Sequence, residues 1–300
     1  MTDVLIIGSG PAGMTAAIYA KRASLNVLVL EKEYEGTGQM AESSRIDNYP
    51  GFYGVNGYEL GEKIREHVEA LGIEFLEGEA VSYEKKADHF QVTLESGEVL
   101  ESKTIIYAAG AAHRKLSVPG SEKFENRGIS YCASCDGAFY RDKDVAVIGG
   151  GNSALDDALL LSEGCKNVYL IHRRDEFRGD AATLEKLEEK ENVEITRKAN
   201  VAEITGDGKV ESLLLDTGAK LNVQGIFVAV GMIPQTAPVK DLVALDESGY
   251  IKAGEDGITS EPGFYVAGDV RTKELRQIIT AAADGANAAN SAIQYILRQA

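Results

Sequence analysis

A unit of strand, glycine turn, helix and second strand occurs twice in this chain, and this repeat constrains the fold more than any other feature. In the first copy an apolar strand over 4–7 leads into Gly8-Ser9-Gly10-Pro11-Ala12-Gly13, followed by a helix over 11–23 and a strand over 26–30. In the second, a strand over 144–148 leads into Gly149-Gly150-Gly151-Asn152-Ser153-Ala154, a helix over 153–163 and a strand over 167–171. Continuous apolar strands that alternate with helices predict parallel sheets. We therefore expect an α/β fold with two Rossmann-like dinucleotide-binding domains.

Segments on both sides of the second unit complete the first one. The stretch over 104–110, ending in Ala109-Gly110, predicts a strand that returns to the first nucleotide site, and 261–269, ending in Gly268-Asp269, predicts another. The second domain is therefore an insertion, which we place at 115–238 within a first domain of 1–114 and 239–300. Alternating apolar and polar residues over 75–100 predict a small antiparallel subsheet that covers the first domain.

Composition narrows the classes of function. The formal net charge of −16 over 300 residues opposes any general attraction to nucleic acid or to an anionic membrane. The N-terminus lacks a signal-peptide pattern, and the apolar runs are strand length, so we expect no membrane span and a cytoplasmic protein. The chain's 3 cysteines cannot form a disulfide scaffold.

The first glycine turn predicts a pyrophosphate site. Gly8 permits the tight turn and Gly10 lets the backbone approach a phosphate, while the helix N-terminus offers unpaired N–H groups. We assign the cofactor contacts here to Ser9, Gly10, Pro11 and Ala12, together with Ala109 and Gly110. Glu31 ends the second strand, where a carboxylate accepts hydrogen bonds from an adenosine ribose. An incidental glycine turn is the alternative, and the flanking strand and helix disfavour it.

The second glycine turn differs at the position that matches Glu31. His172 stands there, followed by a basic stretch that includes Arg173, Arg174 and Arg178. Arginine side chains suit a 2′-phosphate, so we expect this site, with Gly151, Asn152 and Ser153, to prefer NADPH over NADH. The alternative is a solvated basic turn, which the strongly acidic background disfavours.

Cys132 and Cys135, two residues apart, predict a redox-active dithiol. Half of a zinc site and a buried inert pair are the alternatives, but no further ligands show a zinc spacing, and we expect no metal. Asp136 follows directly and is suited to manage the protons of a two-electron transfer. Cys165 is isolated, and we expect it to pack in the core.

Together, 8–13, 132–136, 149–154, 172–178 and 267–269 resemble the low-molecular-weight thioredoxin reductases of bacteria over essentially the whole chain. The resemblance implies FAD in the first domain, NADPH in the second, and a homodimer. It implies that Asp269, preceded by Gly268, contacts the FAD ribitol–phosphate region. The same resemblance puts further residues around the flavin, namely Gly38, Gln39, Asn48, Arg276 and Gln277.

The resemblance also implies a reaction. Cys135 is the sulfur nearer the flavin, Cys132 attacks the protein substrate, and Asp136 is the acid–base residue. We expect NADPH-dependent reduction of thioredoxin or a glutaredoxin-like protein, with rotation of the inserted domain between half-reactions. The alternatives are a flavoprotein that feeds a peroxiredoxin, a ferredoxin-driven reductase, a small-molecule dithiol oxidase, and a nucleotide-sensing protein without catalysis.

Overall fold

The computed structural model describes residues 1–32, 36–43 and 45–299, and the chain forms two compact units. Unit 1 comprises Met1–Ala112 and Ile233–Ala300, and unit 2 comprises His113–Met232. The predicted domain boundaries, after residues 114 and 238, fall within a few residues of these limits. That each unit is an independent domain stays a prediction.

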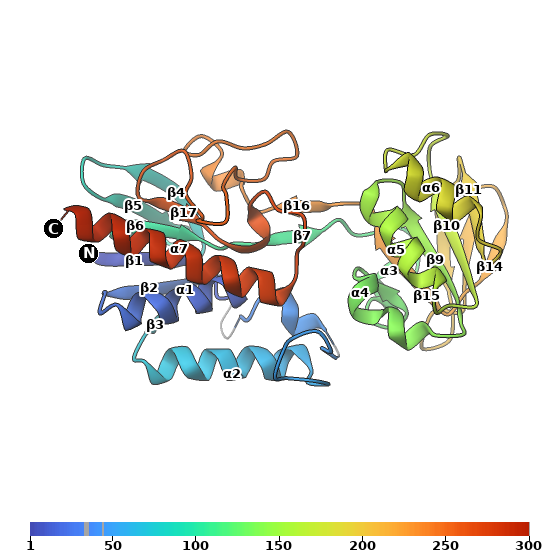
Figure 1. The fold of residues 1–300 in the computed structure, drawn as a ribbon, viewed down its shortest axis with the longest axis horizontal. Helices are drawn as coiled ribbons and strands as arrows, with labels where there is room; N and C mark the ends of the chain where they lie inside the picture. Colours follow the sequence, from blue (N-terminus) through green and yellow to red (C-terminus); the bar gives the residue numbers. More distant parts are fainter. Residues whose placement is uncertain (33–35, 44, 300) are drawn as a thin grey trace. The chain divides into compact units, whose positions relative to one another are not determined.

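Unit 1 is built on a seven-stranded sheet (Figure 1) in the order β3-β2-β1-β6-β5-β4, with β17 paired to β6. Its strands are β1 (Thr2–Ile7), β2 (Val27–Glu31), β3 (Glu74–Glu77), β4 (Ala80–Lys85), β5 (Phe90–Leu94), β6 (Val99–Tyr107) and β17 (Phe264–Val266). Its helices are α1 (Pro11–Arg22), α2 (Gly57–Ala70) and α7 (Ile278–Gln299), with short 3-10 turns η1 (Gln39–Glu42), η3 (Ala237–Val239) and η4 (Gly268–Val270). The expected α/β class is confirmed.

Strand periodicity distributes the core of unit 1 over both faces of its sheet. Val4 and Ile6 pack with residues of α1, α2 and α7, whereas Leu5 and Ile7 pack with β4, β5, β17 and the segment around Val243. Since successive side chains of a strand point to opposite faces, a strand buried on both sides reads as a continuous apolar run.

The predicted antiparallel subsheet differs from the structure. β4 pairs with β5 and β5 pairs with β6, so the hairpin continues the main sheet and does not form a separate layer. The reason is the length of β6, which begins at Val99, upstream of the expected start at Thr104. Its first half pairs with β5, and its second half pairs with β17.

Unit 2 repeats the architecture. A parallel sheet in the order β11-β10-β9-β15-β8 contains β11 (Val193–Arg197), β10 (Asn167–His172), β9 (Asp144–Gly149), β15 (Gly225–Ala229) and β8 (Ile129–Ser130). Its helices are α3 (Ser121–Phe124), α4 (Ala133–Asp136), α5 (Asn152–Ser162) and α6 (Ala181–Glu188), with the 3-10 turn η2 (Gly137–Tyr140). A smaller antiparallel sheet contains β12 (Val201–Thr205), β13 (Ser212–Leu215) and β14 (Lys220–Asn222).

The two faces of the unit 2 sheet bury different partners. Val145 and Val147 pack with α5, whereas Ala146 and Ile148 pack with the residues of β12 and β13. The order β11-β10-β9-β15-β8 corresponds strand for strand to β3-β2-β1-β6-β17 of unit 1. The sequence repeat is therefore a repeat of topology. Where the chain passes from one unit to the other, β7 (Ala111–His113) and β16 (Met232–Pro234) pair as a two-stranded sheet.

Helices α1 and α7 of unit 1 pack so closely that their backbones touch (Figure 1). A Cβ added to Gly285 in α7 would clash with the carbonyl oxygen of Ala12 and would lie 3.0 Å from the backbone nitrogen of Ala16. Only a glycine fits at this crossing.

We predict that Gly285→Ala destabilises the protein by about 1–3 kcal/mol through overpacking, although alanine normally favours a helix interior by about 1 kcal/mol. The matched control is Gly164→Ala, because a Cβ there meets nothing within 4 Å. Urea denaturation followed by circular dichroism measures both variants. A Gly285→Ala protein as stable as the parent would contradict the close packing.

Candidate active site

The first glycine turn lies between the carboxyl end of β1 and the N-terminus of α1. Gly8 has φ +105°, and a Cβ there would lie 2.5 Å from the carbonyl oxygen of Ala108. Gly10 precedes the helix with no side-chain cap, and Pro11 occupies its first turn. The first N–H groups of α1 are thus left for a ligand, which is the arrangement that binds phosphate. The Ser9 hydroxyl donates to the carbonyl oxygen of Gly36 at 2.5 Å.

Loops that are distant in sequence converge on this turn. A Cβ on Gly38 would lie 3.1 Å from the Cα of Gly10, and one on Gly268 would lie 3.0 Å from the Cβ of Ala12. A Cβ on Gly8 would lie 3.4 Å from the Cα of Ala109. Gly38, Ala109 and Gly268 therefore lie beside the glycine turn at the carboxyl edge of the unit 1 sheet, where α/β sheets bind their ligands.

Two buried polar atoms in this region have no hydrogen-bond partner among the described residues: Oδ1 of Asp269 and Nε of Arg276. Burial raises the pKa of Asp269 above its usual value, an effect that Lys273 and Arg276 oppose. The Arg276 guanidinium lies over the Tyr250 ring at 4.3 Å from its centroid. Buried polar atoms without partners are rare in native folds, and here they indicate a site that a polar ligand completes.

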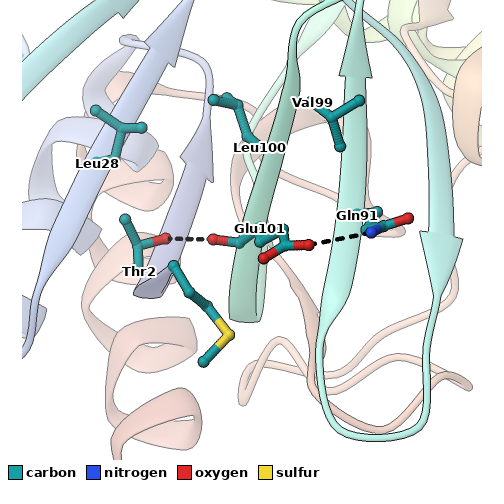
Figure 2. Close-up of a pocket in the computed structure, with 7 residues that line it drawn as sticks. Thr2, Leu28, Gln91, Val99, Leu100 and Glu101 are labelled. Carbon is teal, nitrogen blue, oxygen red and sulfur yellow. Dashed lines mark hydrogen bonds between the residues drawn. The ribbon is translucent and has the colours of Figure 1, made fainter.

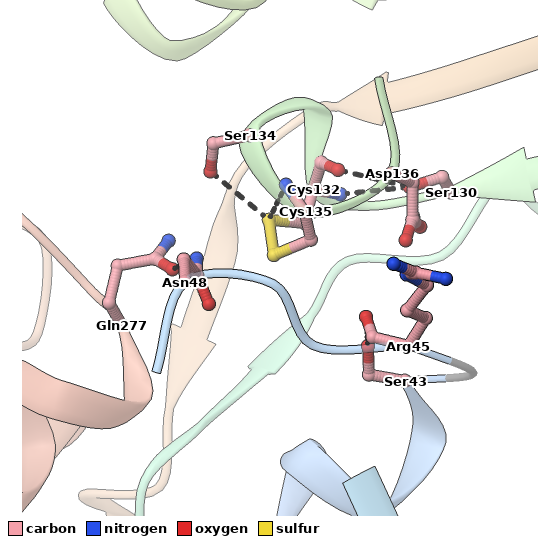
Figure 3. The surroundings of a disulfide bond; sticks show 9 residues. All are labelled: Ser43, Arg45, Asn48, Ser130, Cys132, Ser134, Cys135, Asp136 and Gln277. Carbon is pink, nitrogen blue, oxygen red and sulfur yellow. Dashed lines mark hydrogen bonds between the residues drawn. A yellow bond between two sulfur atoms is a disulfide. The ribbon is translucent and has the colours of Figure 1, made fainter. Parts of the chain in front are cut away.

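Asn48 and Gln277 also come together within unit 1. The Asn48 amide Nδ2 donates to Oε1 of Gln277 at 2.8 Å (Figure 3). The preceding part of the same loop contains Gln39, the first residue of η1. The Gly110 carbonyl accepts a hydrogen bond from the Gln235 N–H at 3.0 Å.

A buried charge cluster that sequence reasoning missed supports the Gly268 loop. The Asp284 carboxylate accepts hydrogen bonds from the Gly268 N–H at 3.0 Å, from the Arg271 guanidinium at 2.6 and 2.8 Å, and from the Lys273 ammonium at 2.8 Å. The three charged side chains are each less than a tenth exposed. Hydrogen bonds and attraction from Arg271 and Lys273 outweigh desolvation and lower the pKa of Asp284. In the sequence these residues lacked a recognisable spacing.

Glu31 lies at the predicted place, the end of β2, and its carboxylate is buried. Arg65 of α2 donates to its two oxygens at 2.8 and 3.0 Å and lies over the Phe75 ring at 3.8 Å from the centroid. A carboxylate has about four acceptor sites, so this bidentate pair leaves capacity for a ribose. That Glu31 binds a ribose stays a prediction. The pattern of α2 gave no reason to single out Arg65.

In unit 2 the basic loop folds back over the second glycine turn. The Arg178 N–H donates to the carbonyl oxygen of Gly150 at 2.8 Å, and the Asp180 N–H donates to Oδ1 of Asn152 at 2.8 Å. Gly151 precedes α5 without a side-chain cap, and a Cβ there would meet nothing within 4 Å. Ser153 is exposed in the first turn of the same helix. The first N–H groups of α5 are thus left without a side-chain cap, an arrangement that suits a phosphate.

His172, at the position that matches Glu31, does not contribute a positive charge. Its ring is buried, packs on Phe177 with centroids 4.7 Å apart, and fills the space that a Cβ on Gly150 would need. Burial lowers its pKa below 6.5, so the imidazole is neutral at pH 7. Positive charge at this turn therefore comes from Arg173, Arg174 and Arg178, whose side chains are exposed. A direct contact of His172 with the nucleotide stays a prediction.

Cys132, the N-cap residue of α4, forms a disulfide with Cys135 of the same short helix (Figure 3), and their Cα atoms are 5.3 Å apart. The Cys135 N–H donates to Sγ of Cys132 at 3.2 Å, and the Ser134 hydroxyl lies 3.4 Å from the same sulfur. Both cysteines are partly exposed. Burial raises the pKa of Asp136, and a hydrogen bond of 2.6 Å from Ser130 opposes this shift. The pair is thus reachable and has a carboxyl group with raised proton affinity beside it.

Other features of the described chain do not form sites. Cys165 is a free thiol within the core against α5, as expected. No group of three or more potential ligands among the residues outside 33–35, 44 and 300 could hold a metal ion. Over the same part of the chain, we find no helix with the length and apolar character to cross a membrane.

Figure 2 shows the residues that line a shallow hollow on unit 1. The hollow is bordered by the starts of β1 and β2 together with β5 and β6, through Met1, Thr2, Leu28, Gln91, Val99, Leu100 and Glu101. The Gln91 amide donates to the Glu101 carboxylate at 3.1 Å, and the Thr2 hydroxyl donates to the Glu101 carbonyl oxygen at 3.4 Å. These polar groups already bond to one another, and the hollow is at the amino edge of the parallel strands, opposite the glycine turn.

Comparison with known proteins gives a family for this geometry. Residues 2–285 match the pyridine nucleotide-disulphide oxidoreductase family. The chain belongs to this family. Thioredoxin reductase of Bacillus subtilis is 38% identical over 300 residues, which cover 98% of this chain and 94% of that protein.

Solved structures agree with the family assignment. Thioredoxin reductase from Streptococcus pyogenes superposes with a TM-score of 0.93 at 42% identity and 99% coverage of both chains. The Lactococcus lactis enzyme, described in its FR conformation, gives a TM-score of 0.70 at 40% identity, covering 99% of this chain and 100% of that one. The resemblance expected from the motifs is confirmed.

We predict that Arg65→Met lowers the free energy of unfolding by about 3–5 kcal/mol, because it leaves the buried Glu31 carboxylate without its partner. Lys103→Met is the control, since its pair with Asp3 is 2.8 Å long but the lysine is 46% exposed, and we expect a loss below about 1 kcal/mol. Denaturant titrations of both variants measure the difference. Equal effects would show that the Arg65–Glu31 pair does not stabilise unit 1.

Proposed function

We propose that this member of the pyridine nucleotide-disulphide oxidoreductase family reduces the disulfide of thioredoxin, or of a similar small redox protein, with electrons from NADPH. The observation that supports this most is that the Cys132–Cys135 disulfide lies in the same unit as the second glycine turn. The arginine-containing loop bonds to that turn through the Arg178 N–H. The names of the relatives support the same reaction and partner.

The residues of unit 1 fit FAD. The uncapped start of α1 suits its pyrophosphate, and the Glu31 carboxylate suits a ribose. The unpartnered Oδ1 of Asp269 suits a hydroxyl donor on the ribitol. Asn48, Arg276 and Gln277 border the same region, and Gly38 and Gly268 let its backbone come close. When bound, FAD supplies the transfer of an electron pair from NADPH to the disulfide.

The residues of unit 2 fit NADPH. Gly151 and the first turn of α5 would bind the pyrophosphate, with Asn152 and Ser153 beside it. Arg173, Arg174 and Arg178 would bind the 2′-phosphate, because guanidinium groups make paired hydrogen bonds with phosphate oxygens. No comparable cation is needed for NADH, which carries a hydroxyl there.

The two cysteines carry the chemistry of the second half-reaction. Once the disulfide has gained two electrons and two protons, Cys132 as thiolate attacks one sulfur of the partner's disulfide and forms a mixed disulfide. Cys135 then attacks Sγ of Cys132, which restores the internal disulfide and releases the partner's second thiolate. Asp136 takes the proton from an attacking thiol and gives it to a leaving thiolate. We assign the attacking role to Cys132 and the flavin-proximal role to Cys135.

One unit holds both the disulfide and the proposed NADPH site, yet each must reach the same flavin in turn. We propose that unit 2 rotates about its two connections, at β7 and β16, between the half-reactions. We further propose a homodimer in the cytoplasm, where a reducing environment keeps an exchangeable dithiol functional.

Replacing Arg173 and Arg174 together with alanine should raise the KM for NADPH about 10- to 100-fold and change that for NADH less than about threefold, because only NADPH carries the phosphate. Steady-state assays with both nucleotides measure the ratio. An equal change for both nucleotides would refute the assignment of these arginines.

The test of the function is NADPH oxidation with and without oxidised thioredoxin. We expect oxidation to depend on thioredoxin and to fall at least about a thousandfold in Cys132→Ser, since no thiolate can attack the partner. Rapid flavin bleaching by NADPH should persist in that variant. Cys165→Ser is the control and should retain activity.

The other outcomes identify the alternatives. Bleaching by NADPH without any effect of thioredoxin would keep the relay but exclude this partner, leaving a flavoprotein that serves a peroxiredoxin. Absence of bleaching would overturn the NADPH site and favour a ferredoxin-driven enzyme. Peroxide formation with a small dithiol and without NADPH would indicate a dithiol oxidase.

A further inference from the structure

A buried serine connects the disulfide to the neighbouring carboxylate. Ser130 is the last residue of β8 and is 6% exposed. Its Oγ lies 2.6 Å from Oδ2 of Asp136 and 3.1 Å from the backbone nitrogen of Cys132 (Figure 3). The backbone carbonyl oxygen of Cys132 is farther from the Ser130 hydroxyl, at 3.4 Å.

The roles of donor and acceptor follow from the chemistry of a hydroxyl. Ser130 has one hydrogen to donate and two lone pairs to accept with. The Cys132 N–H can only donate, so Ser130 accepts from it, and the short contact to Asp136 takes the hydroxyl hydrogen. The result is a directed chain from the Cys132 N–H through Ser130 to the Asp136 carboxylate. Each bond in such a chain polarises the next.

A second set of bonds fixes the same turn from its other side. The Asp136 N–H donates to the carbonyl oxygen of Cys132 at 3.0 Å, and the Cys135 N–H donates to Sγ of Cys132. These bonds within the turn add to the Cys132 N–H bond to Ser130 in holding the backbone around the two cysteines. The carboxylate of Asp136, by contrast, is held by the Ser130 hydroxyl.

Within unit 2, apolar residues pack against the elements that carry Ser130 and Asp136. Ala133 of the same short helix packs in the core with α5, and β8 pairs with the buried Ile226 and Phe227 of β15. Tyr140 of η2 has an ionisable phenol that interacts with Asp136. Burial and the Asp136 carboxylate both raise the pKa of this phenol. Burial penalises the charged form of Asp136, and the Ser130 hydrogen bond favours it.

We propose that Ser130 is a positioning residue of the dithiol centre, whose hydroxyl orients Asp136 beside the cysteines and supports its carboxylate form for proton transfer. This proposal rests on the proposed acid–base role of Asp136. Ser130 does not itself exchange a proton with a sulfur. It sets the protonation state in which Asp136 accepts the proton of an attacking thiol, and that proton later leaves with the released thiolate.

The experiment uses the FAD-loaded protein reduced with dithionite and separated from the excess by gel filtration under argon, then mixed with a chromogenic nitrobenzoate disulfide at a series of pH values. This reagent reports dithiol exchange without NADPH or thioredoxin. In Ser130→Ala the burial penalty on Asp136 remains and the supporting hydrogen bond is lost. The rate of exchange, plotted against pH, should rise as Asp136 loses its proton. We expect this rising limb to move up by about one pH unit in Ser130→Ala, which corresponds to a tenfold change in the proton affinity of Asp136.

Two further variants separate positioning from simple loss of structure. Ser130→Thr keeps the hydroxyl and should return the limb to its original place. Ser162→Ala removes another buried hydroxyl of unit 2, which donates to the Leu159 carbonyl at 2.7 Å, and should leave the limb unmoved. If Ser130→Thr folds poorly, the position of the rising limb in Ser130→Ala is compared with that in Ser162→Ala. A shift in Ser130→Ala alone supports the positioning role, and the same position in both variants overturns it.

The outcomes distinguish the proposal from the function beneath it. A profile of Ser130→Ala lowered equally at every pH, with its limb in place, would overturn the positioning role and leave the dithiol chemistry intact. A wild-type dithiol that does not react with the reagent at any pH would overturn both. A shifted limb in Ser130→Ala, restored by threonine, supports the proposal.

Discussion

Close contact between backbones at the start of α1 determines where the other parts of unit 1 can lie. A Cβ at Gly13 would clash with the carbonyl oxygen of Gly8, and one at Gly285 would clash with that of Ala12. Gly268 also approaches Ala12, and a Cβ on it would lie 3.0 Å from the Ala12 Cβ. Because no side chains intervene, the helix N-terminus, the loop of Gly38 and the 3-10 turn at Gly268 share one edge of the sheet. Because no side chain covers the start of α1, its first backbone N–H groups remain accessible to a phosphate.

Buried charges support this edge in pairs and clusters. Glu31 with Arg65, and Asp284 with Arg271 and Lys273, are well-buried ion pairs of unit 1, whereas pairs such as Lys32–Glu79 are exposed and contribute little. Breaking a buried pair costs far more than forming it gains, so such pairs fix geometry. The Asp284 cluster holds the Gly268 N–H, and Arg65 holds Glu31. In unit 2, the Ser130 hydroxyl holds the Asp136 carboxylate through a hydrogen bond.

The sequence was sufficient where the signal was local and periodic. β1, α1, β2, β9, α5 and β10 lie within a few residues of their expected positions, because apolar runs and glycine turns report local structure directly. It was insufficient where a contact depends on tertiary packing. The pairing of β5 with an extended β6, the neutral buried His172, and the partners Arg65, Lys273 and Ser130 all depend on residues far away in the chain or on burial. Single residues in a pattern do not encode these contacts.

The central claim is that the flavin and the Cys132–Cys135 disulfide form one electron relay. An anaerobic titration with dithionite, followed by flavin absorbance and thiol count, tests it most directly. The account predicts uptake of two electron pairs per chain in the FAD-loaded protein, one for the flavin and one for the disulfide, and of one pair in Cys135→Ser. The same uptake in both proteins, with no new thiols in the parent, would contradict the relay.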